Sequence, residues 1–249
     1  MNNTPSRNEQ DDDFRRLSLT CRNKLIKLCV AALIVITAGC ANTPESSDRN
    51  TTFSLVNHGG MGGSDIMQIR RRVAMPAFKL VDYDGRPFTL NSMQGKWTIM
   101  LFGYTHCPDF CPTTLMELSR AYRNLQRENP ELAAKTQIVF VSVDPFRDSP
   151  EVLADYIAHF NRKFIAVSGT PEELSSFTSL LGVDYSYEDA ITGQPINDTM
   201  HRPPHDYAVN HSGDLYYFDG RTRLAIWISP PHTSDSIVSV LERIAKNSD

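Results

Sequence analysis

Hydrophobic and polar positions along residues 75–249 follow two patterns. Short, nearly continuous apolar runs predict buried strands, and apolar residues recurring every three or four positions predict helices. The strands are predicted at residues 77–82, 88–90, 97–104, 138–143, 164–167, 207–210, 215–218 and 224–228. The helices are predicted at residues 112–128, 150–160, 170–181 and 233–246. Strands and helices alternate through the middle of this region, which predicts an α/β fold whose central mixed sheet is flanked by helices.

Two segments modify this plan. The turn signal Asp84-Gly85 separates the first two strands, so we expect an N-terminal hairpin. Residues 184–206 are rich in proline and contain Gly193, and we expect them to form an irregular loop inserted before the last strands. The pattern as a whole predicts one domain over residues 75–249.

The first 40 residues have the pattern of an export signal. Basic residues precede a short apolar run at residues 28–38, which ends in small residues and is shorter than the roughly 20 residues that span a bilayer. Residues 37–40 resemble a bacterial lipobox, although lipoboxes usually carry Leu where this chain has Thr37. The resemblance implies lipidation of Cys40, and an ordinary signal, cleaved or retained, is the alternative. Residues 41–74 lack periodicity and predict a flexible tether.

Composition and charge limit the kind of protein. The chain has 249 residues, of which 41% are hydrophobic, enough for one medium domain with appendages. Its formal net charge of −4 argues against nucleic acid or an acidic membrane surface as the main partner. Only two of the five cysteines, Cys107 and Cys111, lie in the predicted domain. Such sparse use of cysteine argues against a scaffold held together by disulfides.

Cys107 and Cys111 lie at the turn between a predicted strand and a predicted helix. Side chains four positions apart on a helical turn face the same way, with Cβ atoms roughly 5–6 Å apart. Two sulfur atoms at that spacing can bind one metal ion or form a disulfide. A helix N-terminus also favours the thiolate, which is both the metal ligand and the nucleophile. The pattern therefore indicates soft-metal binding, redox exchange or both; a purely structural disulfide is disfavoured because so short a loop constrains the unfolded chain little.

The surrounding residues resemble a known family. Residues 104–112 are similar to the copper motif of the Sco/SenC family, and three further segments agree with it in order and spacing: 143–150, 206–212 and 218–220. The resemblance covers residues 75–246 and implies a thioredoxin-like fold. It also implies that Cys107 and Cys111 are thiolate ligands of copper and that His211 is an imidazole ligand.

Other residues near these motifs are less defined by the resemblance. The family usually has Asp before its histidine, where this chain has Asn210. Asp144 lies where the family has an acidic residue near the site, so it either tunes the metal or a histidine indirectly or is a turn residue of an Asp-Pro step. The roles of three further histidines stay open between accessory ligands and surface residues: His106, His201 and His205.

With the export signal, the resemblance leads us to expect a membrane-anchored copper metallochaperone that faces the bacterial periplasm. The resemblance implies that it delivers copper to the copper A site of cytochrome c oxidase subunit II. Two thiolates suit Cu(I), and an added imidazole also serves Cu(II). We expect a monomer that does not bind nucleic acid and is not an enzyme in the sense of turnover. The alternative is a thiol–disulfide oxidoreductase that keeps the partner's copper-site cysteines reduced through Cys107 and Cys111. A redox or copper sensor is a third hypothesis.

Overall fold

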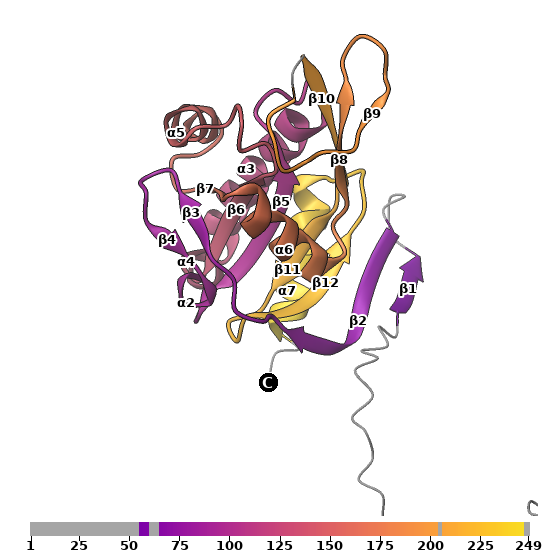
Figure 1. Cartoon of the computed structure of the whole chain (residues 1–249). Helices are drawn as coiled ribbons and strands as arrows, with labels where there is room; N and C mark the ends of the chain where they lie inside the picture. The colour runs from indigo at the N-terminus through magenta and orange to yellow at the C-terminus, as the bar shows by residue number, and fades with distance from the viewer. Residues whose placement is uncertain (1–54, 60–64, 204–205, 247–249) are drawn as a thin grey trace, which may run out of the picture. The chain divides into compact units, whose positions relative to one another are not determined.

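The computed structural model describes residues 55–59, 65–203 and 206–246 (Figure 1). Within them, one sheet has the strand order β1-β2-β12-β11-β5-β6-β7-β3-β4 and a smaller sheet has the order β10-β8-β9. The strands of the large sheet are β1 (Leu55–Gly59), β2 (Asp65–Ala74), β3 (Leu80–Asp82), β4 (Pro87–Phe88), β5 (Trp97–Gly103), β6 (Thr136–Ser142), β7 (Ile165–Ser168), β11 (Leu215–Phe218) and β12 (Arg223–Ile228). The small sheet consists of β8 (Tyr185–Asp189), β9 (Pro195–Ile196) and β10 (Tyr207–His211). The helices are α2 (Leu90–Met93), α3 (Phe110–Glu128), α4 (Pro130–Ala134), α5 (Pro150–Ala158), α6 (Pro171–Leu181) and α7 (Ser234–Lys246).

The large sheet is mixed, as the sequence predicts. β5 pairs in parallel with β6 and antiparallel with β11, and β6 pairs in parallel with β7. Every residue of β5 and β6 is buried, because helices and loops cover both faces of these central strands. Their apolar runs are therefore continuous instead of alternating. The expected α/β architecture is confirmed.

Alternate residues of β5 enter two different cores. Ile99 and Leu101 pack with buried residues of α3, α4, α5 and α7 on one face. Met100 and Phe102 pack on the other face with α2, α6 and the inner residues of β8 and β10. This division follows from the twofold period of a strand, in which neighbouring side chains point to opposite faces. Figure 1 shows the small sheet beside the end of β5 that leads into α3.

The predicted N-terminal hairpin is present, with β3 and β4 antiparallel and Gly85 in the left-handed region at φ +77°. The irregular loop predicted for residues 184–206 is wrong in part, because β8 and β9 lie within it. Tyr185 and Tyr187 alternate with polar residues along β8, and the ring of Tyr187 is fully buried. The prolines of this segment obscured that alternation, and Pro195 is tolerated because β9 lies at the edge of the small sheet.

The sheet also extends into the segment predicted to be a tether. β2 pairs antiparallel with β12, and β1 pairs antiparallel with β2. Residues 55–59 and 65–74 are thus strands of the sheet, and the prediction of a flexible tether is wrong for them. The signal segment and Cys40 lie outside the described residues, and the domain boundaries otherwise stay a prediction. None of the helices that the structure describes is long and apolar enough to cross a membrane.

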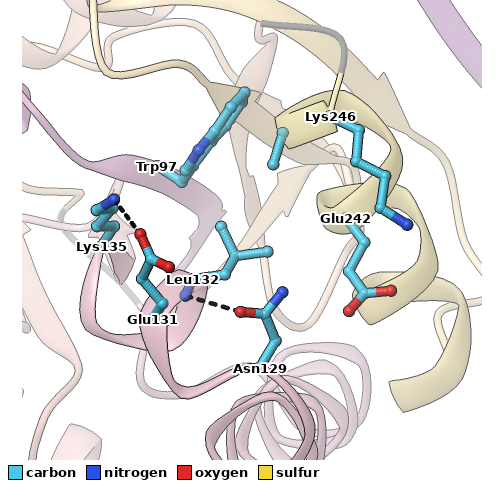
Figure 2. Close-up of a pocket in the computed structure, with 8 residues that line it drawn as sticks. Trp97, Asn129, Glu131, Leu132, Lys135, Glu242 and Lys246 are labelled. Atoms are coloured by element: carbon cyan, nitrogen blue, oxygen red, sulfur yellow. Dashed lines mark hydrogen bonds and ion pairs between the residues drawn. The ribbon is translucent and has the colours of Figure 1, made fainter.

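A pocket of about 280 Å³ lies at the opposite end of β5 from the cysteines, between α4 and α7 (Figure 2). Trp97 and Leu132 form its apolar part, while Glu131 and Lys135 pair with each other at its edge at 2.8 Å. It shares no residue with the cysteine and histidine motifs. The pocket is therefore separate from the site that the sequence predicts.

Candidate metal centre

The two cysteines lie where β5 passes into α3, and they differ in burial. The helix begins at Phe110, two residues earlier than predicted, so Cys111 is inside its first turn and Cys107 is in the preceding loop. Cys111 is fully buried, whereas Cys107 is half-buried. The backbone N–H of Cys111 donates to Sγ of Cys107 at 3.5 Å. This N–H of the first helical turn has no acceptor within the helix, and its hydrogen bond to Sγ helps to stabilise a thiolate at Cys107.

Gly103 makes room for the buried cysteine. A Cβ atom at this last position of β5 would lie 2.4 Å from Sγ of Cys111 and 2.9 Å from the ring of Phe140. Any larger residue would therefore displace the sulfur atom or the ring. A glycine directly before the cysteine turn is thus a steric requirement of the site.

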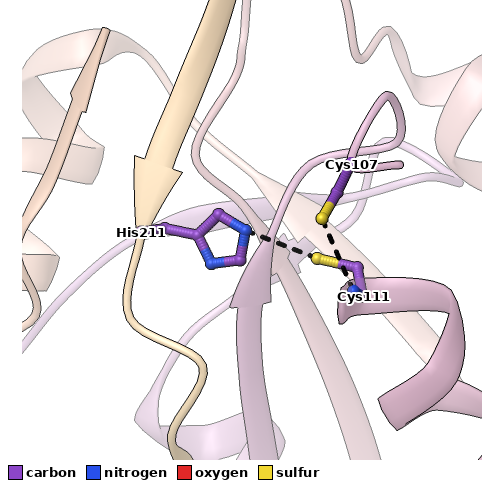
Figure 3. A group of neighbouring side chains, drawn as sticks. All are labelled: Cys107, Cys111 and His211. Carbon is purple, nitrogen blue, oxygen red and sulfur yellow. Dashed lines mark hydrogen bonds between the residues drawn. The ribbon is translucent and has the colours of Figure 1, made fainter. Parts of the chain in front are cut away.

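His211 is the last residue of β10 and approaches the cysteines from the small sheet (Figure 3). Its Nδ1 donates to the carbonyl oxygen of Ser212 at 2.9 Å, and since a carbonyl only accepts, Nδ1 carries a proton. Its Nε2 lies 3.5 Å from Sγ of Cys111. One donor atom from each of Cys107, Cys111 and His211 lies within 4.8 Å of the others. The structure therefore brings together the three residues that the sequence predicts as ligands.

The turn after His211 packs directly on the start of α3. A Cβ atom on Gly213 would lie 2.4 Å from the ring of Phe110, so this close approach requires glycine. Nε2 of His232 donates to the carbonyl oxygen of Gly213 at 2.9 Å, and burial lowers the pKa of His232. A neutral His232 thus supports the turn that carries His211.

The cysteine pair is polarised into a thiolate and a thiol. The hydrogen bond from the Cys111 thiol is the largest influence on Cys107, and His211 and the backbone N–H of Cys111 act in the same direction. Together they outweigh burial and lower the pKa of Cys107 to about 3. The same hydrogen bond, together with burial, raises the pKa of Cys111. The half-buried sulfur is therefore the charged one, able to bind a soft metal or to attack a disulfide.

Asp148 holds the loop before Cys107. This buried carboxylate accepts from the backbone N–H of Thr105 at 2.9 Å, from the Thr105 hydroxyl at 2.6 Å and from the Ser142 hydroxyl at 2.5 Å. Burial raises its pKa although these hydrogen bonds oppose the shift. The sequence analysis did not identify this role of Asp148, because nothing local links it to a residue 43 positions away.

Asp144 is fully buried and does not belong to the group of three. It accepts from the Tyr207 hydroxyl at 2.6 Å and from Nε of Arg147 at 2.5 Å. Arg147 lies over the rings of Tyr207 and Tyr104, and Tyr104 meets the His211 ring edge-on at 5.8 Å between centroids. Asp144 thus reaches the site only through other side chains. The sequence analysis assigned no role to Arg147, Tyr104 or Tyr207, although each lies in a segment that it singled out.

The remaining candidate residues lie apart from the three ligating atoms. The His106 side chain is 58% exposed, with Nδ1 3.1 Å from the Thr105 hydroxyl, and His201 is exposed and paired with Asp198 at 2.8 Å. Among the described residues, neither histidine belongs to the group of close donor atoms formed by Cys107, Cys111 and His211, and His205 lies outside the described residues. Asn210 donates to Glu188 on β8 at 2.9 Å. Cys107 and Cys111 are free cysteines in this structure, with no disulfide between them.

Three features define the class of this protein. The sheet is mixed with helices on both faces, a cysteine pair lies at a strand-to-helix turn, and a histidine comes from a strand of the small sheet. Together they define a thioredoxin-like protein with a soft-metal donor set. A model of the SCO1/SenC family matches residues 67–246. The chain belongs to this family.

Individual relatives agree with this placement. A Stutzerimonas stutzeri protein named as copper-binding is 31% identical over 216 residues, which cover 87% of this chain and 95% of the relative. The protein SCO2, mitochondrial, of Saccharomyces cerevisiae is 34% identical over 177 residues; the match covers 71% of this chain but only 49% of the yeast protein. The chain thus spans about half the length of that relative.

Solved structures of the family share the fold. Arabidopsis thaliana ScoI with copper bound is 30% identical, with a TM-score of 0.58 over 69% of this chain and 98% of that structure. Apo Sco1 from Thermus thermophilus is 32% identical, with a TM-score of 0.60 over 71% of this chain and 94% of that structure. The predicted thioredoxin-like fold is confirmed.

Proposed function

We propose that this protein is a copper carrier that binds one copper ion through Cys107, Cys111 and His211. The observation that carries the proposal is the convergence of two sulfur atoms and one imidazole nitrogen within 4.8 Å. Thiolates prefer Cu(I), and the imidazole extends the set to Cu(II). A similar protein that has been solved with copper bound, from Arabidopsis thaliana, supports the choice of metal.

The site is built for release as well as binding. Cys107 is half-buried, so a thiolate of a partner protein has access to a metal held there. Its pKa of about 3 means that protons do not compete with the metal near neutral pH. Copper would pass by ligand exchange, with the partner's sulfur atoms replacing Cys107 and then Cys111. Such stepwise exchange distinguishes a carrier from a closed structural metal site.

The partner and location that we propose come from the sequence and from the family resemblance. The partner is a copper protein, and the family suggests the copper A site of cytochrome c oxidase subunit II. The export signal and the lipobox-like residues 37–40 support a membrane-anchored protein facing the periplasm, with Cys40 lipidated. A net charge of −4 supports a protein partner over nucleic acid, and we expect a monomer.

A copper titration of the reduced protein tests this function, with bound metal measured after desalting. One copper per chain should be retained, lost in the double variant Cys107→Ser/Cys111→Ser and weakened in the Cu(II) form by His211→Ala. No retained copper in the unmodified protein would refute the carrier.

A second function is favoured by the asymmetry of the cysteine pair. An accessible Cys107 thiolate beside a buried, protonated Cys111 is the arrangement of an attacking and a resolving thiol. The Cys107 thiolate would attack a partner's disulfide and release one of its thiolates. The Cys111 thiol would then lose its proton and displace the second, leaving a Cys107–Cys111 disulfide and a reduced partner. In this reductase, His211→Ala keeps thiol–disulfide exchange, whereas in the carrier it lowers Cu(II) affinity.

A further inference from the structure

The strand that carries His211 has no backbone pairing with the sheet that carries the cysteines. In the described residues β10 is hydrogen-bonded to β8, and the small sheet shares no strand pair with the large one. The cysteines are positioned by β5 and α3 of the large sheet. The distance between His211 and the sulfur atoms is therefore set by side chains and turns that join two separate sheets.

Arg147 is the side chain that joins these parts at the base of β10. It lies on the loop between β6 and α5, and one guanidinium nitrogen donates to the backbone carbonyl of Tyr207 at 2.8 Å. The guanidinium carbon lies 3.7 Å from the centroid of the Tyr207 ring and 5.5 Å from that of Tyr104. One planar cation thus contacts the first residue of β10 and the residue that follows β5.

Asp144 orients the guanidinium of Arg147 through a hydrogen-bonded ion pair. It receives the Nε–H of Arg147 and the hydroxyl of Tyr207, so the carboxylate, the guanidinium and the ring form a closed triangle. The Asp144 side chain is fully buried, and only 15% of the Arg147 side chain is exposed. A buried ion pair recovers little net stability, because removing both charges from water offsets their attraction. One buried guanidinium nitrogen also has no acceptor among the described residues. This costly arrangement is better explained by positioning than by stability.

The contacts continue from Arg147 to the imidazole. Tyr104 presents its ring to the cation and meets the His211 ring at 85°. The carbonyl oxygen of Tyr104 also accepts from the backbone N–H of Cys107 at 3.2 Å. Tyr104 therefore touches both halves of the donor set, and Arg147 holds it against β10.

We propose that Arg147 is a positioning residue that holds His211 at its distance from Cys107 and Cys111, and thereby sets the affinity and geometry of the site for Cu(II). The inference rests on the proposed copper binding. Cu(I) needs only the two thiolates, so it depends on Arg147 far less than Cu(II), which uses the imidazole as well. The role is distinct from that of a ligand, because Arg147 contacts no donor atom of the group.

The test compares Arg147→Met with His211→Ala and the unmodified chain, each purified and reduced. Dissociation constants for Cu(I) and Cu(II) are measured by competition with chelators, and the thiolate-to-Cu(II) absorption band and electron paramagnetic resonance spectrum are recorded. Arg120→Met is the matched control, because it removes an exposed arginine of α3 whose partner is Glu117. Arg147→Lys is the second variant: it keeps the charge but not the planar, multiply donating guanidinium.

Arg147→Met should raise the Kd for Cu(II) about 10- to 100-fold, which is the range seen when a residue that orients a metal ligand is removed. It should also shift the Cu(II) spectrum toward that of His211→Ala. The Kd for Cu(I) should stay within about threefold of that of the unmodified chain, because both thiolate ligands remain. Arg147→Lys should show a smaller change of the same kind, and Arg120→Met none. Cu(II) binding unchanged in both Arg147 variants would overturn the inference. So would a parallel loss of both oxidation states or of folding in both, since either result indicates a general structural role.

A metal-free measurement separates this inference from the proposed function. The ring resonances of His211 in the apo protein report its tautomer and orientation by nuclear magnetic resonance. Arg147→Met should shift or broaden them, with those of the exposed His159 at the end of α5 as an internal reference. If the unmodified chain binds no copper, the carrier fails but this readout still decides whether Arg147 positions His211.

Discussion

Sγ of Cys111 lies 3.5 Å from Nε2 of His211, although 100 residues separate them in the chain. The sulfur atom belongs to the first turn of α3, and the imidazole belongs to the last residue of β10. Two glycines allow this contact: Gly103 leaves room for the sulfur atom, and Gly213 lets the turn after His211 lie on the ring of Phe110. The donor set is therefore assembled from two separately supported halves, which can be perturbed one at a time.

Replacing the imidazole should separate the two oxidation states of copper. His211→Ala removes the only nitrogen donor in the group of three and leaves both sulfur atoms. Removing a residue that only orients a metal ligand already costs about 10- to 100-fold in metal affinity. His211→Ala removes the ligand itself, so we expect the Kd for Cu(II) to rise by at least that factor. Cu(I) binding should be largely retained because two thiolates suffice for it. Competition titrations in each oxidation state measure both values, and equal losses for Cu(I) and Cu(II) would contradict the assignment.

The lowered pKa of Cys107 should appear as reactivity in acid. A folded pKa of about 3 lies below the ordinary value, so the thiolate persists as the pH falls until it approaches that pKa. An ordinary thiol loses reactivity about tenfold per unit below pH ~8.5. Alkylation of Cys107 by iodoacetamide should instead be nearly constant between about pH 5 and 8. Mass spectrometry of the peptide that contains Cys107 gives the rate.

The same experiment contains its own comparison. Cys111 is fully buried and its pKa is raised, so it should stay unmodified in the folded protein and react only after unfolding. Cys107→Ser should abolish the acid-resistant reaction. A rate for Cys107 that follows the ordinary thiol curve would show that the pair is not polarised.

Asp148 should stabilise both the fold and the cysteine loop. Asp148→Ala leaves the backbone N–H and hydroxyl of Thr105 and the hydroxyl of Ser142 without their acceptor. Unsatisfied buried donors cost about 1–3 kcal/mol each, and hydroxyls can rotate to other partners, so we expect a loss of about 2–4 kcal/mol in the free energy of unfolding. Urea denaturation measures it.

Asp148→Asn is the matched variant, because its amide oxygen still accepts some of these hydrogen bonds. It should lose less stability than Asp148→Ala. Equal stabilities of the alanine variant and the unmodified protein would mean that the loop does not depend on this carboxylate.

Adding one methyl group at Gly103 should damage the site sterically. The new Cβ atom would lie 2.4 Å from Sγ of Cys111, well inside contact distance. Overpacking of this kind costs about 1–3 kcal/mol, and displacement of the sulfur atom should also weaken copper binding. Gly220→Ala is the control, since its nearest non-bonded neighbour would lie at 3.4 Å. Denaturation and copper titration of the two variants should differ; similar behaviour would show that Cys111 moves aside without cost.

The central strands and the main helices were predictable because their apolar patterns are local. The run at residues 97–104 and the helical spacing at residues 112–128 correspond to β5 and α3. β8 and β9 were missed because the prolines and glycine around them dominate a local reading, whereas the burial of Tyr187 against β10 and Val143 comes from distant parts of the chain. β2 was missed for the same reason, since its order comes from pairing with β12.

The sequence by itself determined which residues carry the chemistry. Spacing placed the two cysteines together at a strand-to-helix turn, because a helical turn has a fixed period. The histidine, 100 residues from Cys111, came only from the family resemblance. Only the tertiary structure decided which sulfur atom is charged and that Asp148 anchors the loop before Cys107. It also decided that Arg147, bound by Asp144, joins the strand of His211 to the loop between β6 and α5. These properties depend on burial and on hydrogen bonds between residues far apart in sequence, which exist only after the chain has folded.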